Sequence, residues 1–246
     1  MDNPNLIPGF PSLIDHALVW IFGWILPFLS GVKGREQLAG AIFSETARRK
    51  FYLGNSLFLC LAAAIVAMAW GFQGRSFQNM GFRNPHAGTL VYGVLLTLCI
   101  LMLWLFDFIL TLRKQSADAS TGVEEAEFPP FLPRHLRELP AYLVLSMSAA
   151  IFEEIIYRGF MVTYFLPSAR GQSGWPLAAL TVPALLFSLA HYYQGWKAVL
   201  KIWGFSLGLG LLFIITGSLW PLMIIHFIID FAGGWAAMAL SRKKHL

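Results

Sequence analysis

Long apolar runs, separated by short polar breaks, cover most of the chain. A helix needs roughly 20 apolar residues to cross the hydrocarbon core of a bilayer. The break HYYQGWK, at residues 191–197, is short, so the pattern allows six to eight such helices. We predict an all-α fold, a polytopic transmembrane helix bundle of about seven spans. The predicted spans lie near residues 12–31, 51–72, 88–112, 140–165, 176–194, 198–216 and 219–240.

The one long polar stretch divides this pattern into three parts of a single, integrated membrane domain. Residues 1–112 hold the amino-terminal transmembrane helices. Residues 113–139 are rich in Ser, Glu and Pro, which predicts a cytoplasmic loop that ends in a short interfacial helix. Residues 140–246 form the carboxyl-terminal helical core, and the candidate chemistry lies there.

The composition agrees with a membrane location. Hydrophobic residues make up 57% of the chain and charged residues 13%, which excludes a soluble domain of this size. In a soluble protein, the net charge of +5 would suggest nucleic acid as a partner. Here the basic residues lie at the ends of apolar runs, so we expect a lipid bilayer around the protein and no nucleic acid.

The distribution of basic residues predicts the topology. If the loop 32–50 is cytoplasmic, most of the 18 Lys and Arg residues fall on that side, and only Arg75, Arg83 and Arg170 fall on the other. The positive-inside rule then favours an outside amino terminus and a cytoplasmic carboxyl terminus. The compact length, with no transit-peptide pattern, favours the cytoplasmic membrane of a bacterium over an organelle.

Three ionisable residues interrupt the apolar segment AAIFEEIIYRGF at residues 149–160. A charge near the bilayer centre costs roughly 2.5–3.5 kcal/mol, so it must be offset by pairing, by water or by a function. Glu154 and Arg158 stand four residues apart on one helix face, in the favoured order for an ion pair. Glu153 projects about a quarter turn away, which leaves it free to face a cavity. The alternative is that all three residues only hold helices together.

Two later segments carry further candidates. In FSLAH, Phe187 and His191 share a helix face, although a lone histidine is more often bonded to a backbone carbonyl or a neighbouring helix than catalytic. In HFIID, Asp230 stands four residues after His226, so its carboxylate could orient or charge the imidazole. Taken alone, that pair could equally serve helix packing.

Together the three clusters place acids and bases on three apolar helices that could converge in a buried polar pocket. Such a set suits hydrolysis. A carboxylate can take a proton from water, a histidine can help activate that water or protonate the leaving amine, and imidazole donors can stabilise an oxyanion. No serine or cysteine lies in a nucleophile elbow, so we expect no covalent intermediate.

The three motifs, EEIIYR at 153–158, FSLAH at 187–191 and HFIID at 226–230, resemble those of the CPBP family. This is the intramembrane CAAX-protease and bacteriocin-processing group, also called Abi proteins, with the motifs EExxxR, FxxxH and HxxxN or HxxxD. The resemblance covers about the carboxyl-terminal half, from Pro140 onward. It implies an all-helical, glutamic-type intramembrane endopeptidase that acts on a membrane-associated protein or peptide and needs no cofactor.

The resemblance also implies a role for each motif residue. Glu153 would be the general base and His191 its partner in activating water. His226 and the residue at 230 would stabilise the oxyanion. The remaining motif residues, Glu154, Arg158 and Phe187, would support and shape the site.

One departure from the motif matters for the mechanism. Many CAAX-type members carry asparagine at position 230, where this chain has Asp230. An ionised aspartate repels an oxyanion. Asp230 therefore either is protonated and donates directly, or orients and charges His226, which is the version that we favour.

Several other interpretations remain open. Glutamates and histidines are zinc ligands, so a zinc metalloprotease that uses the same cluster is the nearest alternative, although the chain lacks HExxH and we expect no metal. A non-catalytic membrane scaffold or immunity protein, and a proton-relaying transporter, are alternatives from other classes. We expect Asp15, His16 and Asp107, near span ends, to snorkel to the interface. Nothing in the sequence selects a particular substrate.

Overall fold

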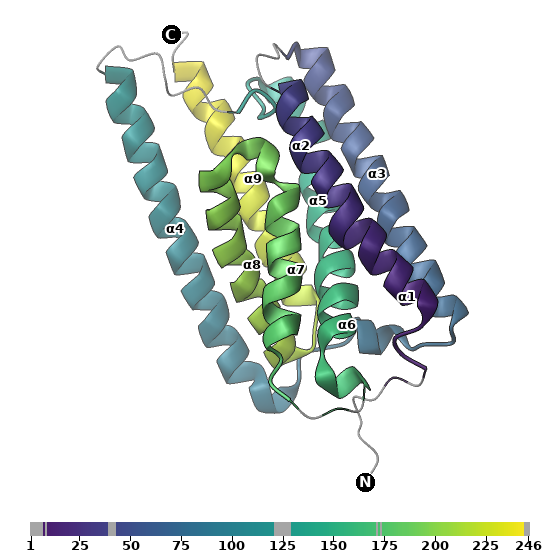
Figure 1. Cartoon of the computed structure of the whole chain (residues 1–246). Coiled ribbons are helices and arrows are strands. Elements are labelled where there is room, and N and C mark those ends of the chain that lie inside the picture. The colour runs from purple at the N-terminus through teal and green to yellow at the C-terminus, as the bar shows by residue number, and fades with distance from the viewer. Residues whose placement is uncertain are drawn as a thin grey trace.

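The computed structural model describes residues 7, 9–38, 43–120, 129–170, 172 and 174–243. All regular secondary structure in these ranges is helical, and the long helices pack side by side into one bundle (Figure 1). The predicted fold class is therefore confirmed. The elements are α1 Leu13–Leu18, η1 Val19–Ile25, α2 Leu26–Leu38, α3 Glu45–Phe72, η2 Phe77–Met80, η3 Ala87–Thr89, α4 Leu90–Ser120, η4 Leu136–Glu138, α5 Leu139–Glu153, η5 Glu154–Val162, α6 Thr163–Phe165, η6 Pro167–Arg170, α7 Leu177–Ala190, η7 Tyr192–Gln194, α8 Trp196–Thr216 and α9 Trp220–Lys243.

Within the described ranges, six helical segments are long and apolar enough to cross a membrane. The fifth predicted span is a shorter apolar helix, because α7 ends at Ala190 and the turn η7 follows it. Gly195, with φ +92°, separates that turn from α8. The prediction of about seven spans is thus confirmed. The six long segments are Leu13–Glu36, Glu45–Phe72, Ala87–Arg113, Leu136–Phe165, Trp196–Thr216 and Trp220–Ala239.

The fourth span is not one continuous α-helix. After α5 the backbone adopts a π-helix over η5, in which each N–H bonds five residues back, and it then returns to α-helix in α6. Single π-helical turns inside α-helices are frequent at functional sites. Here the π-helix begins at Glu154, inside the first ionisable motif.

Segment η5 also lies at the centre of the core, since all nine of its residues are buried. Gly159 permits the closest approach. A Cβ there would lie 2.9 Å from both Cγ and the carbonyl oxygen of Met80, at the end of η2. The motif EEIIYR is therefore held inside the bundle and does not face lipid.

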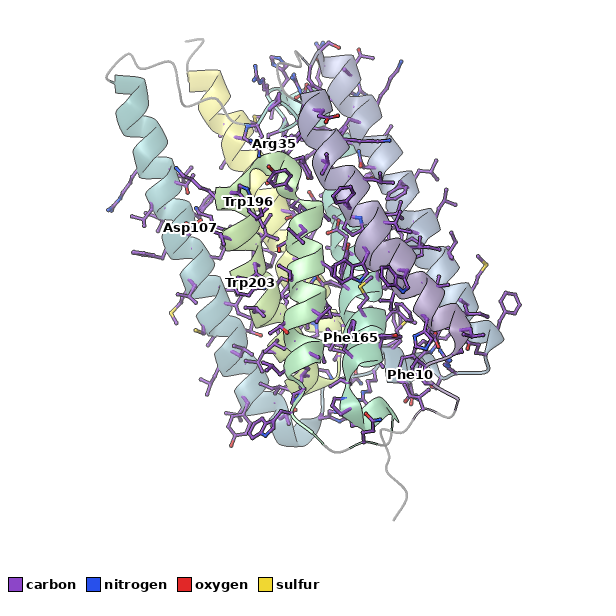
Figure 2. The ribbon with its side chains drawn as sticks, in the orientation of Figure 1. Phe10, Arg35, Asp107, Phe165, Trp196 and Trp203 are labelled. Atoms are coloured by element: carbon purple, nitrogen blue, oxygen red, sulfur yellow. The ribbon has the colours of Figure 1, made fainter. Side chains whose placement is uncertain are left out.

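Helix α4 is the least buried of the long helices and packs along α8 (Figure 1). Three contacts at seven-residue intervals on α4 define this packing. A Cβ on Gly93 would lie 2.8 Å from Thr216, and one on Gly208 would lie 3.2 Å from Ile100. Figure 2 shows the third α4 position, Asp107, which pairs with Lys201 Nζ at 2.6 Å.

The helix of the third span extends into the predicted polar loop. The membrane-spanning part ends at Arg113, close to the predicted residue 112, but helix α4 continues to Ser120. Residues 121–128, in the middle of the predicted loop, lie outside the described ranges. The short helix η4 lies near the end of this stretch, where Glu138 accepts hydrogen bonds from the guanidinium of Arg48 on α3.

The prediction that Asp15 snorkels to the interface is wrong. Its carboxylate is buried and accepts two hydrogen bonds from Arg75, at 2.8 and 2.7 Å. The Arg75 guanidinium also lies over the rings of Phe10 and Trp70. Asp15 can be buried because Arg75, 60 residues away in the sequence, neutralises its charge. His16 is exposed, but its ring is hydrogen-bonded to the hydroxyl of Tyr164. Asp107 is half-exposed and is paired, as described above.

We predict that Asp15→Ala destabilises the protein by about 3–5 kcal/mol, because it leaves the buried Arg75 guanidinium without its counter-ion. The measurement is the thermal unfolding of the detergent-solubilised protein. Glu45→Ala, which removes an exposed partner 3.8 Å from Arg49, is the control and should change stability by less than about 1 kcal/mol. Equal effects of the two variants would contradict the prediction.

Candidate active site

The four predicted catalytic residues line one cavity between the helices. The cavity has a volume of about 1130 Å³, enough for many water molecules or a peptide segment. Glu153 contributes from α5, His191 from the end of α7, and His226 and Asp230 from α9. Apolar residues of α2, α3, α4 and α8 complete the wall. Segments far apart in the sequence therefore bring the three motifs to one cavity.

The two adjacent glutamates have different surroundings. The side chain of Glu153 lines the cavity and is 15% exposed, whereas that of Glu154 is 0% exposed. Arg158 donates from Nη1 to Glu154 Oε1 at 2.7 Å. The predicted ion pair therefore forms, and the neighbouring Glu153 faces the cavity, as the helix geometry indicated.

Glu154 also binds the third motif. Its Oε1 lies 2.8 Å from His226 Nδ1. Because this carboxylate oxygen already accepts from Arg158, His226 Nδ1 must carry the proton of the bond. The other ring nitrogen, Nε2, lies 3.7 Å from Glu153 Oε2 and 3.5 Å from Asp230 Oδ2. These distances are longer than a good hydrogen bond, so Nε2 makes no direct hydrogen bond to either carboxylate.

This arrangement modifies the expectation for Asp230. The bond that orients the His226 ring comes from Glu154, while Asp230 lies near the opposite nitrogen and retains partial exposure to the cavity. Asp230 can therefore supply charge next to Nε2, but it does not fix the tautomer. The backbone carbonyl of Asp230 accepts a hydrogen bond from Tyr142 of α5, which ties α9 to that helix.

His191 is held by its own helix. Its Nδ1 bonds the carbonyl oxygen of Phe187 at 2.9 Å, so Nδ1 is the donor and Nε2 is left without a proton in the neutral ring. His191 thus makes the hydrogen bond to a backbone carbonyl that is usual for a lone histidine. Its ring also lines the cavity.

Phe187 connects the clusters through its ring. The Arg158 guanidinium lies over one face, 4.7 Å from the centroid. The His191 ring centroid is also 4.7 Å away, and the His226 ring makes an edge contact at 6.1 Å. Phe187 therefore packs against the guanidinium and both imidazoles and restricts where each can lie.

One polar residue near the cluster was missed by the sequence reasoning. Ser206 of α8 is buried, and its hydroxyl accepts a hydrogen bond from Arg158 Nη2 at 2.8 Å. It occurs in KIWGFSLGLG as a single serine without a motif. Only its isolation in an apolar run could have drawn attention to it.

A metal site was the nearest alternative for these residues. Within the ranges that the structure describes, no three His, Cys, Asp or Glu side chains converge in a geometry that could hold a metal ion.

Residues 135–232 match the family described as "Rce1-like: Type II CAAX prenyl endopeptidase Rce1-like". This segment is less than half of the chain, and it contains every residue of the three motifs. The match confirms the resemblance to the CAAX-protease group that the motifs predicted.

A curated relative matches the chain over a similar length. The chain is 29% identical over 96 residues to "Uncharacterized protein YpbD" of Bacillus subtilis (strain 168), which covers 38% of this chain and 44% of the relative. The chain thus spans less than half the length of the curated relative that it matches. No solved structure matches the chain.

The two cysteines offer a test of whether water fills the cavity. Both are free and exposed, but only Cys99 lines the cavity, while Cys60 lies elsewhere on α3. Because the thiolate is the reactive form and needs water, a polar maleimide should label Cys99 several-fold faster than Cys60 in membranes. Mass spectrometry of tryptic peptides measures both sites. Labelling of Cys60 at the same rate or faster would show that the cavity is not hydrated at this depth.

Proposed function

We propose that the protein is an intramembrane endopeptidase that hydrolyses a peptide bond of a membrane-associated protein or peptide. One observation carries the proposal: Glu153 and His226 lie 3.7 Å apart on the wall of a large cavity among membrane-spanning helices. The match of residues 135–232 to an endopeptidase family supports it independently.

Glu153 is the proposed general base. It takes one proton from a water molecule while the water oxygen attacks the carbonyl carbon of the peptide bond. His191 assists by accepting a hydrogen bond from the same water at its unprotonated Nε2. The proton then passes from Glu153 to the departing amide nitrogen, the C–N bond breaks, and the products are a carboxylic acid and an amine. No covalent bond forms between protein and substrate.

His226 is the proposed stabiliser of the oxyanion. Its Nδ1 proton is committed to Glu154, so a second proton on Nε2 lets the ring donate into the cavity. The carboxylates of Glu153, Glu154 and Asp230, all within 4 Å of the ring, can balance the charge of this protonated imidazole. Asp230 thus contributes through His226, since a direct approach of an ionised carboxylate would repel the oxyanion.

The cavity also supports a direction of approach for the substrate. Phe131 and Leu132, and Tyr193 and Gln194 of η7, line it at the end of the bundle that the positive-inside rule predicts to be cytoplasmic. With the amino terminus outside and the carboxyl terminus cytoplasmic, substrates would reach the motifs from the cytoplasmic side or the bilayer. A bacterial cytoplasmic membrane is the proposed location.

We predict that Glu153→Ala reduces cleavage by at least about 100-fold, because the general base is lost, while the protein still inserts and folds. Cells that carry the wild-type or variant chain are compared by mass spectrometry of membrane-protein termini. Glu45→Ala, at the start of α3, is the control. A variant that fails to fold favours the scaffold alternative. If the wild-type protein produces no new protein terminus in these cells, the proposal of proteolysis is contradicted. Loss of cleavage on exhaustive chelation would favour the zinc enzyme.

Asp230→Asn separates the two roles considered for that residue. The amide keeps the shape of the side chain and can donate directly, but it removes a negative charge 3.5 Å from His226 Nε2. If Asp230 acts through the charge of His226, we expect cleavage to fall by about 10-fold or more. The measurement is the rate of formation of the terminus identified above. Retained cleavage would instead indicate direct donation from a protonated acid.

A further inference from the structure

Helix α8 carries none of the three motifs, yet one of its side chains reaches the cluster. Ser206 is buried among apolar neighbours, and its Oγ accepts from Arg158 Nη2 at 2.8 Å. It is not among the residues that line the cavity. Ser206 therefore contacts the site from behind, through Arg158.

Arg158 is held at three points. Nη1 donates to Glu154, Nη2 donates to Ser206, and the guanidinium carbon lies 4.7 Å from the Phe187 ring centroid. A guanidinium is planar, and its N–H groups form a rigid fork. Fixing Nη2 on α8 therefore also fixes the direction in which Nη1 meets Glu154.

The position of Glu154 depends on this contact. Its Oε1 accepts from both Arg158 and His226, whereas its buried Oε2 has no hydrogen-bond partner among the described residues. The two bonds at Oε1 are thus what orients the carboxylate. Any change in the direction of the Arg158 fork moves Oε1, and with it the hydrogen bond that holds His226.

We propose that Ser206 is a positioning residue, whose hydroxyl acts through Arg158 and Glu154 to hold the Nδ1–H of His226 on Glu154 and keep Nε2 directed at the cavity. Its effect on cleavage rests on the proposed function, but its effect on the His226 ring does not. Four side chains from α8, η5 and α9 form the connection, and only three of them belong to the motifs.

Three variants test this role. Ser206→Ala removes the hydroxyl, and Ser206→Thr restores one. Ser188→Ala is the matched control, because Ser188 is equally buried and donates only to the Leu185 carbonyl of its own helix. At a pH high enough for the rings to be neutral, histidine labelled with ¹⁵N reports the tautomer of each ring by NMR, and loss of a signal in His226→Ala assigns the ring. We expect the wild type, Ser206→Thr and Ser188→Ala to show the Nδ1–H form and Ser206→Ala to show a mixture.

Cleavage kinetics give a second readout. With the substrate identified from the disappearing terminus, we expect Ser206→Ala to lower kcat about 10-fold with KM unchanged, and Ser206→Thr to restore most of it. A lower melting temperature with an unchanged tautomer and kcat would make Ser206 a packing residue and overturn the proposal. Absence of cleavage by the wild type would refute the peptidase alone, because the NMR comparison still decides the role of Ser206.

Discussion

The whole site depends on how one carboxylate is neutralised inside an apolar bundle. Glu154 is fully buried, and an ionised carboxylate in such surroundings needs strong hydrogen-bond donors. Its Oε1 receives two, from Arg158 on the same helical segment and from His226 on α9. This double contact joins two of the motifs and fixes the ring of His226. It also leaves the adjacent Glu153 without a competing partner on its own helix, so that residue can face the cavity.

The sequence was most informative where the chemistry is local. Residues four apart on a helix share a face, so the pairs Glu154 with Arg158, Phe187 with His191 and His226 with Asp230 could be recognised from spacing, and each is in proximity in the structure. The high cost of charge in lipid then made the segments that carry these pairs conspicuous. The count of spans followed from apolar length alone, and its weakest point, the short α7, was where the pattern was most ambiguous.

Contacts between helices could not be obtained in this way. The bond from His226 to Glu154 joins residues 72 positions apart, and the burial of Asp15 depends on Arg75, 60 positions away. Helical periodicity shows which face a residue occupies, but not which helix lies opposite that face. Ser206 has no repeating signal at all. The π-helix was likewise invisible, because its geometry arises from packing around η5 and not from a composition that differs from that of an α-helix.

The π-helix makes the length of its segment as important as its composition. A π-helical turn holds one residue more than the α-helix on either side of it. Deleting Ile155, Ile156 or Tyr157 would let the backbone return to the α-helical register and turn the Arg158 side chain by about 100° about the axis. The guanidinium could then no longer connect Ser206 of α8 with Glu154, although every residue of the motif would still be present. The number of residues in this segment is therefore a constraint in its own right, separate from the identity of the motif residues.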